Sequence, residues 1–118
     1  MVFEFDLAFL SEESFGRLYD YVAELFDGSN NPTLHSVCLA IAEEKNRRSV
    51  GEPSVKSIEI AFEGVTAALL VEAVNLSAAA GRSAARRADF RLAAFFSELI
   101  ETITKEVSRQ GMPVPTIH

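Results

Sequence analysis

Two side chains could take part in metal or nucleophilic chemistry: His35 and Cys38, which lie three residues apart. That spacing places both on one face of a helix, where an imidazole and a thiolate could bind zinc or act as base and nucleophile. A zinc site needs more ligands than these two, and the only other histidine is His118. Cys38 also shares an apolar stripe with Leu34 and Val37, where a cysteine is usually a small core residue. We therefore expect no metal, no cofactor and no catalytic residue.

Sequence motifs of common enzymes are missing as well. The chain has no glycine-rich phosphate loop and no Gly-x-Ser-x-Gly nucleophile elbow. Its acidic doublets, Glu12/Glu13 and Glu43/Glu44, are typical of solvated helix surface rather than of a paired-carboxylate site. The sequence thus favours a non-enzymatic protein, with a small helical enzyme or a ligand-binding bundle of unknown substrate as the alternative.

Four arginines and one acid gather in the segment 81–91, GRSAARRADFR. The chain as a whole carries a formal net charge of −6, and the acidic excess lies in residues 1–31, where seven acids accompany Arg17 alone. Nucleic-acid binders usually show a wide basic face, so this balance argues against nucleic acid as a partner. The arginines instead favour ion pairs, either inside the chain or with another protein, and a solvated helix face is the alternative for any such run of charges.

Phe90 stands apart from the apolar stripe of the last predicted helix and projects roughly opposite to it. An aromatic side chain among arginines is typical of the energetic centre of a protein interface. The alternative is that the N-terminal segment covers Phe90, or that it is merely exposed. The predicted partner-binding residues are Phe90, Arg86, Arg87, Arg91 and Ala94. The stripe that faces the core comprises Ala85, Ala88, Leu92, Phe95, Phe96, Leu99, Ile100, Ile103 and Val107.

Arg86 and Arg87 fall in the first turn of that helix if Ser83 is its N-cap. The positive end of the helix dipole disfavours cations there. We therefore expect a compensating anionic group, supplied by the acids of the first helix or by another molecule.

The elements that position these residues begin with a strand over 2–10, where apolar and polar residues alternate. Ser11 then predicts the start of a helix that ends at Gly28. Asn31 and Pro32 open a second helix over 33–48, although a strand is the alternative there. The alternation over 55–63 favours a strand, with a helix as the close competitor.

The last half of the chain predicts two helices joined by a very short link. Thr66 is the expected cap of a helix that reaches Ala80, Gly81 ends it, and Ser83 caps a last helix that runs to about Gln110. So short a link implies an antiparallel pair. The predicted fold is mainly α: a small helical bundle with a C-terminal antiparallel helical hairpin and a minor two-stranded β element. A single domain spans 1–118, with 111–118 as a flexible tail.

The helix after Thr66 is apolar on two sides, which predicts either a central position in the bundle or a subunit interface. Its second stripe comprises Ala67, Val71, Val74 and Ala78, whose small side chains would allow close approach. We expect this stripe to form the interface of a homodimer.

Cysteine usage and hydropathy bear on the compartment. One cysteine rules out an internal disulfide, the first residues lack the pattern of a signal peptide, and no apolar stretch is long enough to cross a membrane. The expectation is a cytoplasmic protein that does not associate with membranes.

The alanine-rich hairpin VTAALLVEAVNLSAAAGRSAARRADFRLAAFFSELIETITKEV, together with the size and acidic balance of the chain, resembles the QslA-like bacterial antiactivators of LuxR-type quorum-sensing receptors. The resemblance covers roughly the last half of the chain. It implies a regulatory protein that binds the ligand-binding domain of a LuxR-type transcriptional regulator and blocks its dimerisation. No site residue is carried over from it.

Overall fold

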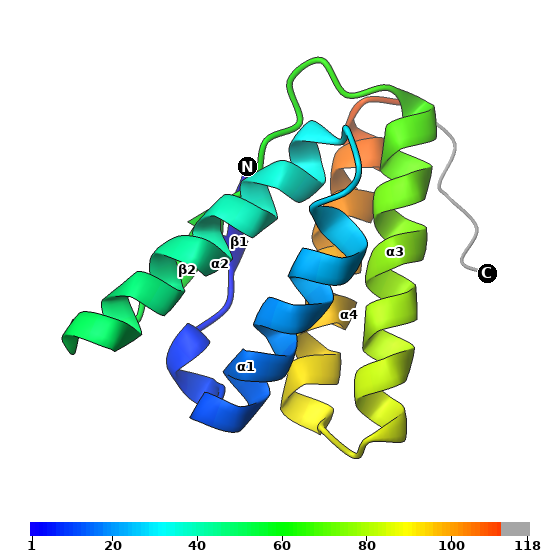
Figure 1. Cartoon of the computed structure of the whole chain (residues 1–118). Helices are drawn as coiled ribbons and strands as arrows, with labels where there is room; N and C mark the ends of the chain where they lie inside the picture. The colour runs from blue at the N-terminus through cyan, green and yellow to red at the C-terminus, as the bar shows by residue number, and fades with distance from the viewer. Residues whose placement is uncertain (112–118) are drawn as a thin grey trace.

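The structure is a computed structural model that describes residues 1–111. These residues form four α-helices and one short two-stranded sheet, with two further short helical segments (Figure 1). The predicted helical bundle with a C-terminal hairpin and a two-stranded sheet is confirmed. The predicted flexible tail, 111–118, lies outside the described residues apart from Gly111. The elements are β1 (Val2–Glu4), the 3-10 helix η1 (Leu7–Phe9), α1 (Glu12–Tyr21), the π-helix η2 (Val22–Phe26), α2 (Pro32–Val50), β2 (Ser57–Glu59), α3 (Ala67–Arg86) and α4 (Phe90–Arg109).

Three helices begin at the predicted capping residues. The side chains of Ser11, Asn31 and Thr66 accept hydrogen bonds from backbone N–H groups in the first turns of α1, α2 and α3. Each bond satisfies a donor that the helix itself leaves free. The segment 33–48 is therefore helical rather than a strand, and α2 ends at Gly51, whose φ of 77° is the left-handed conformation that favours glycine.

Both strands are shorter than predicted. β1 stops at Glu4 because Asp6 accepts a hydrogen bond from the N–H of Ala8 at 3.0 Å and turns the chain into η1. β1 and β2 pair antiparallel, with Phe3 opposite Ile58. These two side chains are buried, whereas the neighbours of each along its strand are exposed, so the alternation in sequence does report which face is covered.

The link between the last two helices lies later than predicted. α3 runs through Gly81 to Arg86, and a Cβ atom at Gly81 would lie only 3.3 Å from the Cβ of Phe96. Glycine at this position therefore allows α3 and α4 to approach closely and does not end the helix. Ser83 is not a cap either: its hydroxyl lies 3.0 Å from that of Tyr21, inside α3. The cap of α4 is Asp89.

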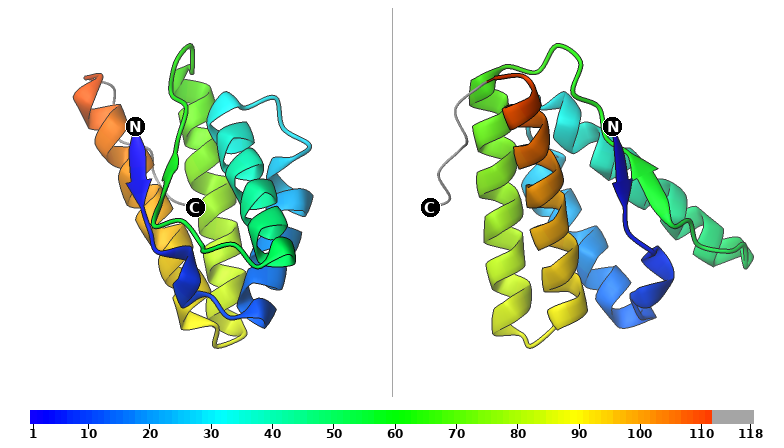
Figure 2. Two further views of the ribbon diagram at one scale, coloured as in Figure 1. Left: turned by 90° about the vertical axis from the view of Figure 1, so that its left-hand side faces the viewer. Right: turned by 180° about the vertical axis from the view of Figure 1, so that it is seen from behind.

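The core lies where α1, η2, α3 and α4 meet, with the sheet and α2 against them (Figure 2). Phe95 and Phe96 of α4 lie at its centre, with ring centroids 5.3 Å apart and nearly perpendicular planes. The predicted α4 stripe is correct from Leu92 onward. It is wrong for Ala85 and Ala88, which are exposed because they belong to the end of α3 and to the turn that follows.

Candidate protein-binding surface

The turn between α3 and α4 is fixed by Asp89, a buried carboxylate that caps α4. Its oxygens accept hydrogen bonds from the N–H of Leu92 at 3.3 Å, the hydroxyl of Ser14 at 2.8 Å and the guanidinium of Arg17 at 2.7 Å. Burial raises the pKa of Asp89, but the bonds from Ser14, Arg17 and Leu92 outweigh it, so the pKa lies below the ordinary value. The carboxylate therefore stays charged and ties the turn to α1.

This turn presents Phe90, the first residue of α4, to solvent with 70% of its surface exposed. Its neighbour Arg91 donates a hydrogen bond to the carbonyl of Phe9 at 3.1 Å, and Phe9 is itself 59% exposed. One guanidinium thus joins α4 to η1, and each of the two elements carries an exposed phenyl ring. Phe9 was not among the predicted site residues, because a strand over 2–10 would have buried it.

All five predicted partner-binding residues are exposed in the structure, and with Phe9 they form what we term the aromatic end of the molecule. The five predicted residues come from the last turn of α3, the turn between α3 and α4, and the start of α4, whereas Phe9 comes from η1. The members of the aromatic end are Phe9, Arg86, Arg87, Phe90, Arg91 and Ala94.

The electrostatic position of Arg86 differs from the prediction. It lies in the last turn of α3 rather than in the first turn of α4. The negative end of the helix dipole favours a cation there, by a few tenths of a kcal/mol at an exposed site. No compensating anion is therefore required inside the molecule.

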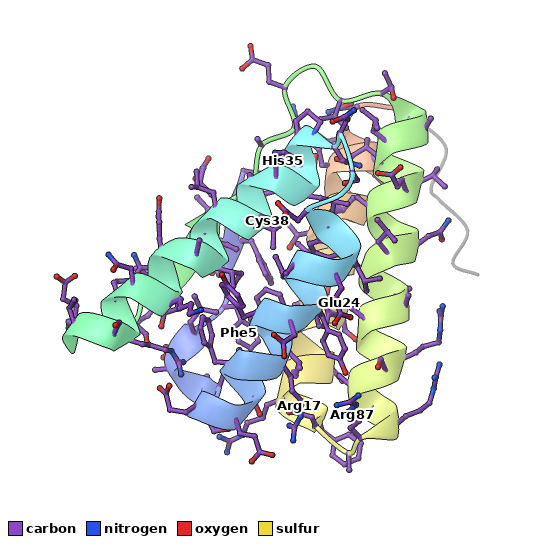
Figure 3. The ribbon with its side chains drawn as sticks, viewed as in Figure 1. Phe5, Arg17, Glu24, His35, Cys38 and Arg87 are labelled. Carbon is purple, nitrogen blue, oxygen red and sulfur yellow. The ribbon has the colours of Figure 1, made fainter. Side chains whose placement is uncertain are left out.

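Of the two anion sources expected for these arginines, the acids of the first helix do not pair with them among residues 1–111. Glu12 pairs with Arg48 at 3.0 Å, and Glu13 pairs with Arg17 at 2.6 Å. No carboxylate lies within ion-pair distance of Arg86 or Arg87 in that part of the chain. Figure 3 shows Arg17 on α1 and Arg87 at the end of α3.

The predicted dimer stripe on α3 is divided between surface and core. Val74 and Ala78 are 1% and 6% exposed within the single chain, so for these two residues the interface prediction is corrected to core packing. Ala67 and Val71 are exposed, Val71 to 37%. The uncovered apolar surface on this side is therefore much smaller than the sequence indicated.

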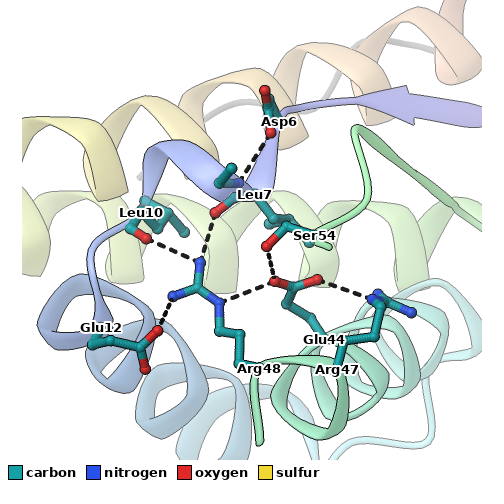
Figure 4. A network of polar contacts seen from close by, with 9 residues as sticks. Asp6, Leu7, Leu10, Glu12, Glu44, Arg47, Arg48 and Ser54 are labelled. Carbon is teal, nitrogen blue, oxygen red and sulfur yellow. Dashed lines mark hydrogen bonds and ion pairs between the residues drawn. The ribbon is translucent and has the colours of Figure 1, made fainter. Parts of the chain in front are cut away.

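Glu44 is fully buried, which overturns its interpretation as half of a solvated doublet. Its carboxylate accepts hydrogen bonds from Arg47 at 3.1 Å, from Arg48 at 3.0 Å and from the hydroxyl of Ser54 (Figure 4). Burial raises the pKa of Glu44, but the hydrogen bonds from Ser54, Arg48 and Arg47 lower it by more, so the pKa lies below its ordinary value.

Arg48 carries this network to the N-terminal segment. Its guanidinium donates to the carbonyls of Leu7 and Leu10 at 2.8 and 2.9 Å and pairs with Glu12. These bonds hold η1, and with it Phe9, against α2. The network therefore supports one side of the aromatic end and has the character of a structural ion cluster.

The two candidate catalytic residues do not form a reactive pair. The Nε2 of His35 donates to the carbonyl of Ser29 at 3.0 Å, which places the exposed imidazole over the loop before α2. Cys38 is half-buried against the core, and burial together with the nearby charge of Asp27 raises the pKa of its thiol to about 11. Within residues 1–111, no group of three His, Cys, Asp or Glu side chains could hold a metal ion.

Two surface hollows lined by residues 1–111 are large enough for a small ligand, and several of the charged groups that line them bind partners within the chain. A hollow of about 840 Å³ includes Glu106 and Arg109, which pair with each other, and this bond lowers the pKa of Glu106 to about 2. A second hollow of about 410 Å³ lies between α1 and α2, where the ammonium of Lys45 sits 4.0 Å from the ring centre of Tyr19. These contacts stabilise the fold and do not single out a substrate.

Comparison of the chain with protein family models, with curated proteins and with solved structures gives no match. No helix among residues 1–111 is both long and apolar enough to cross a bilayer.

Proposed function

We propose that the protein is a non-enzymatic, protein-binding regulatory module whose contact surface is the aromatic end. The observation that carries this proposal is Phe90, a large apolar side chain that is 70% exposed on a turn held rigidly by Asp89. Exposed aromatic side chains next to arginines are characteristic of interface hot spots. A rigid turn also lowers the conformational entropy lost on binding.

Phe90 can supply much of the binding free energy. Full burial of a phenylalanine side chain from water contributes about 1.5–3 kcal/mol. Phe9 adds a second ring that a partner could cover. Arg91 is already oriented by its bond to the carbonyl of Phe9, so a partner would not have to order it.

The resemblance of the hairpin to QslA-like antiactivators gives the proposal a specific form. The partner would be a LuxR-type transcriptional regulator, bound through its ligand-binding domain so that it cannot dimerise. The protein would act in the cytoplasm, which a single cysteine that can form no disulfide within the chain favours. The predicted homodimer would use a different surface, on α3, where Ala67 and Val71 are the exposed residues of the predicted interface.

Site-specific photocrosslinking tests the binding surface directly. Benzoylphenylalanine placed at position 90 is expected to crosslink one protein in the native cell. The same group at Leu39, which is 63% exposed on α2, is the matched control for an exposed apolar site elsewhere. A product at position 90 and none at position 39 supports the proposal, whereas equal labelling or no product contradicts it.

A reporter assay tests the specific form. Co-expression with a LuxR-type regulator should reduce transcription from its promoter, and Phe90→Ala should restore it. Full repression by the Phe90→Ala variant, or no repression by the native protein, argues against the antiactivator assignment.

A further inference from the structure

Three arginines have no partner among residues 1–111: Arg86 and Arg87, which belong to the aromatic end, and Arg82, which lies one turn earlier on α3. None of them makes a side-chain hydrogen bond or an ion pair in that part of the chain. Arg82 and Arg86 lie four residues apart on α3, which places them on one face of the helix. Arg87 follows in the turn that leads to Phe90.

The remaining five arginines are all engaged. Four of them, Arg17, Arg47, Arg48 and Arg109, bind carboxylates, and Arg91 binds a backbone carbonyl. Among residues 1–111, the arginines without a side-chain partner therefore all lie in the segment 82–87 at the end of α3, in a chain whose net charge is −6. Free guanidinium groups in one place constitute a surface complementary to carboxylates.

A second copy of the chain bound through the same surface would place the unpaired Arg86 and Arg87 of both copies in one interface. Like charges opposed in this way cost free energy, so this surface does not suit a symmetric dimer. A nucleic acid would meet the local arginines but also the field of an acidic protein, and it would leave the isolated rings with little to cover them.

We infer that the aromatic end, together with the adjoining Arg82, binds an acidic segment of a partner protein, with an apolar side chain against Phe90 and carboxylates against Arg82, Arg86 and Arg87. The inference rests on the proposed function, because it names the chemistry of the partner for that same surface. Phe90 supplies the apolar contact, and the arginines supply charge complementarity and speed the encounter.

Two synthetic helical peptides test the inference with the full-length protein. Both carry leucine along one face, and the other positions are all Glu in the acidic peptide and all Gln in the neutral one. Fluorescence anisotropy of labelled peptide gives the dissociation constants at low and at high salt. The variants are Phe90→Ala and the double variant Arg86→Gln/Arg87→Gln, with Lys56→Gln as an exposed charge-removing control outside the aromatic end.

The acidic peptide is expected to bind about tenfold more tightly than the neutral one at low salt, with a difference that shrinks as salt screens the charges. Arg86→Gln/Arg87→Gln should remove most of that difference and leave the neutral peptide unaffected. Phe90→Ala should weaken both peptides by about 30-fold, as loss of a hot-spot aromatic does. Lys56→Gln should bind like the native protein.

Other outcomes overturn the inference in distinguishable ways. If the native protein binds both peptides with equal affinity and Phe90→Ala weakens both, the inference of an acidic partner is rejected, whereas the aromatic end remains supported as a binding surface. Binding of a labelled single-stranded oligonucleotide as tightly as the acidic peptide, unaffected by Phe90→Ala, assigns the arginines to a general polyanion site. Absence of binding to either peptide also rejects the inference, and photocrosslinking at position 90 then decides separately whether the proposed function stands.

Discussion

Replacing Glu44 with glutamine should destabilise the protein substantially, because Glu44 is the centre of the buried ion cluster. The variant loses the negative charge that faces Arg47 and Arg48 and keeps a single oxygen acceptor for three donors. Removing one partner of a fully buried pair costs about 3–5 kcal/mol. Arg48 retains Glu12 and two carbonyls, and Arg47 is 20% exposed, so the expected loss is smaller, about 2–3 kcal/mol of unfolding free energy.

Urea unfolding followed by far-ultraviolet circular dichroism at neutral pH measures this loss. A change of that size corresponds to a decrease in melting temperature of about 10 °C in a domain of this length. Glu43→Gln is the matched control, since Glu43 is the adjacent, exposed carboxylate. It should change the unfolding free energy by less than about 0.5 kcal/mol.

The pH dependence gives a second and independent measure. The pKa of Glu44 is lower in the folded protein than its reference value of 4.5, so its contribution is complete above that pH and disappears as the pH falls through the folded pKa. The difference in stability between native protein and Glu44→Gln should therefore shrink in acid. Glu106 and Asp89 titrate in both proteins and cancel in the comparison. Equal stability of Glu44→Gln and Glu43→Gln at neutral pH, or a difference that does not shrink in acid, would refute the reasoning.

Four further substitutions or reactions probe the rest of the structure. Asp89→Ala removes the cap of α4 and the carboxylate that accepts hydrogen bonds from Ser14 and Arg17. It should lower the unfolding free energy by about 2–3 kcal/mol in a denaturant titration. Phe90→Ala should change it by less than about 0.5 kcal/mol, and a larger change would mean that the ring stabilises the fold. Cys38, with a pKa of about 11, should react slowly with a thiol reagent at neutral pH, so rapid labelling of the native protein would contradict its buried environment. Val71→Glu should dissociate any homodimer formed through α3, and sedimentation of the native protein as a monomer at high concentration would exclude that dimer.

The helix starts were predictable because their signals are local. A cap at Ser11, Asn31 or Thr66 acts on backbone groups two or three residues away, so the sequence holds all of the necessary information. The apolar stripe of α4 was predictable for the same reason, since its period follows from helix geometry alone. The exposure of Phe90 followed from its position outside that stripe.

The end of α3 and the buried charges depend on contacts between distant residues. Gly81 has the same appearance in sequence whether it ends a helix or allows Phe96 to approach, and only the position of α4 distinguishes the two. Glu44 looks like a surface residue until Ser54 and the two arginines surround it. The capping role of Asp89 does have a local signal, because it is the only acidic residue in segment 81–91 and stands three residues before Leu92, where the apolar run of α4 begins.

The pairing of β1 with β2 has a kinetic consequence for the aromatic end. The hairpin of α3 and α4 closes a loop of a few residues, whereas pairing Phe3 with Ile58 closes a much longer one and loses correspondingly more chain entropy. Elements with local contacts form earlier in folding, so the hairpin should assemble before the N-terminal segment docks. Phe90 belongs to the early element and Phe9 to the late one. A full-length chain that refolds therefore forms the first half of its binding surface before the second, and the complete surface marks a chain that has finished folding.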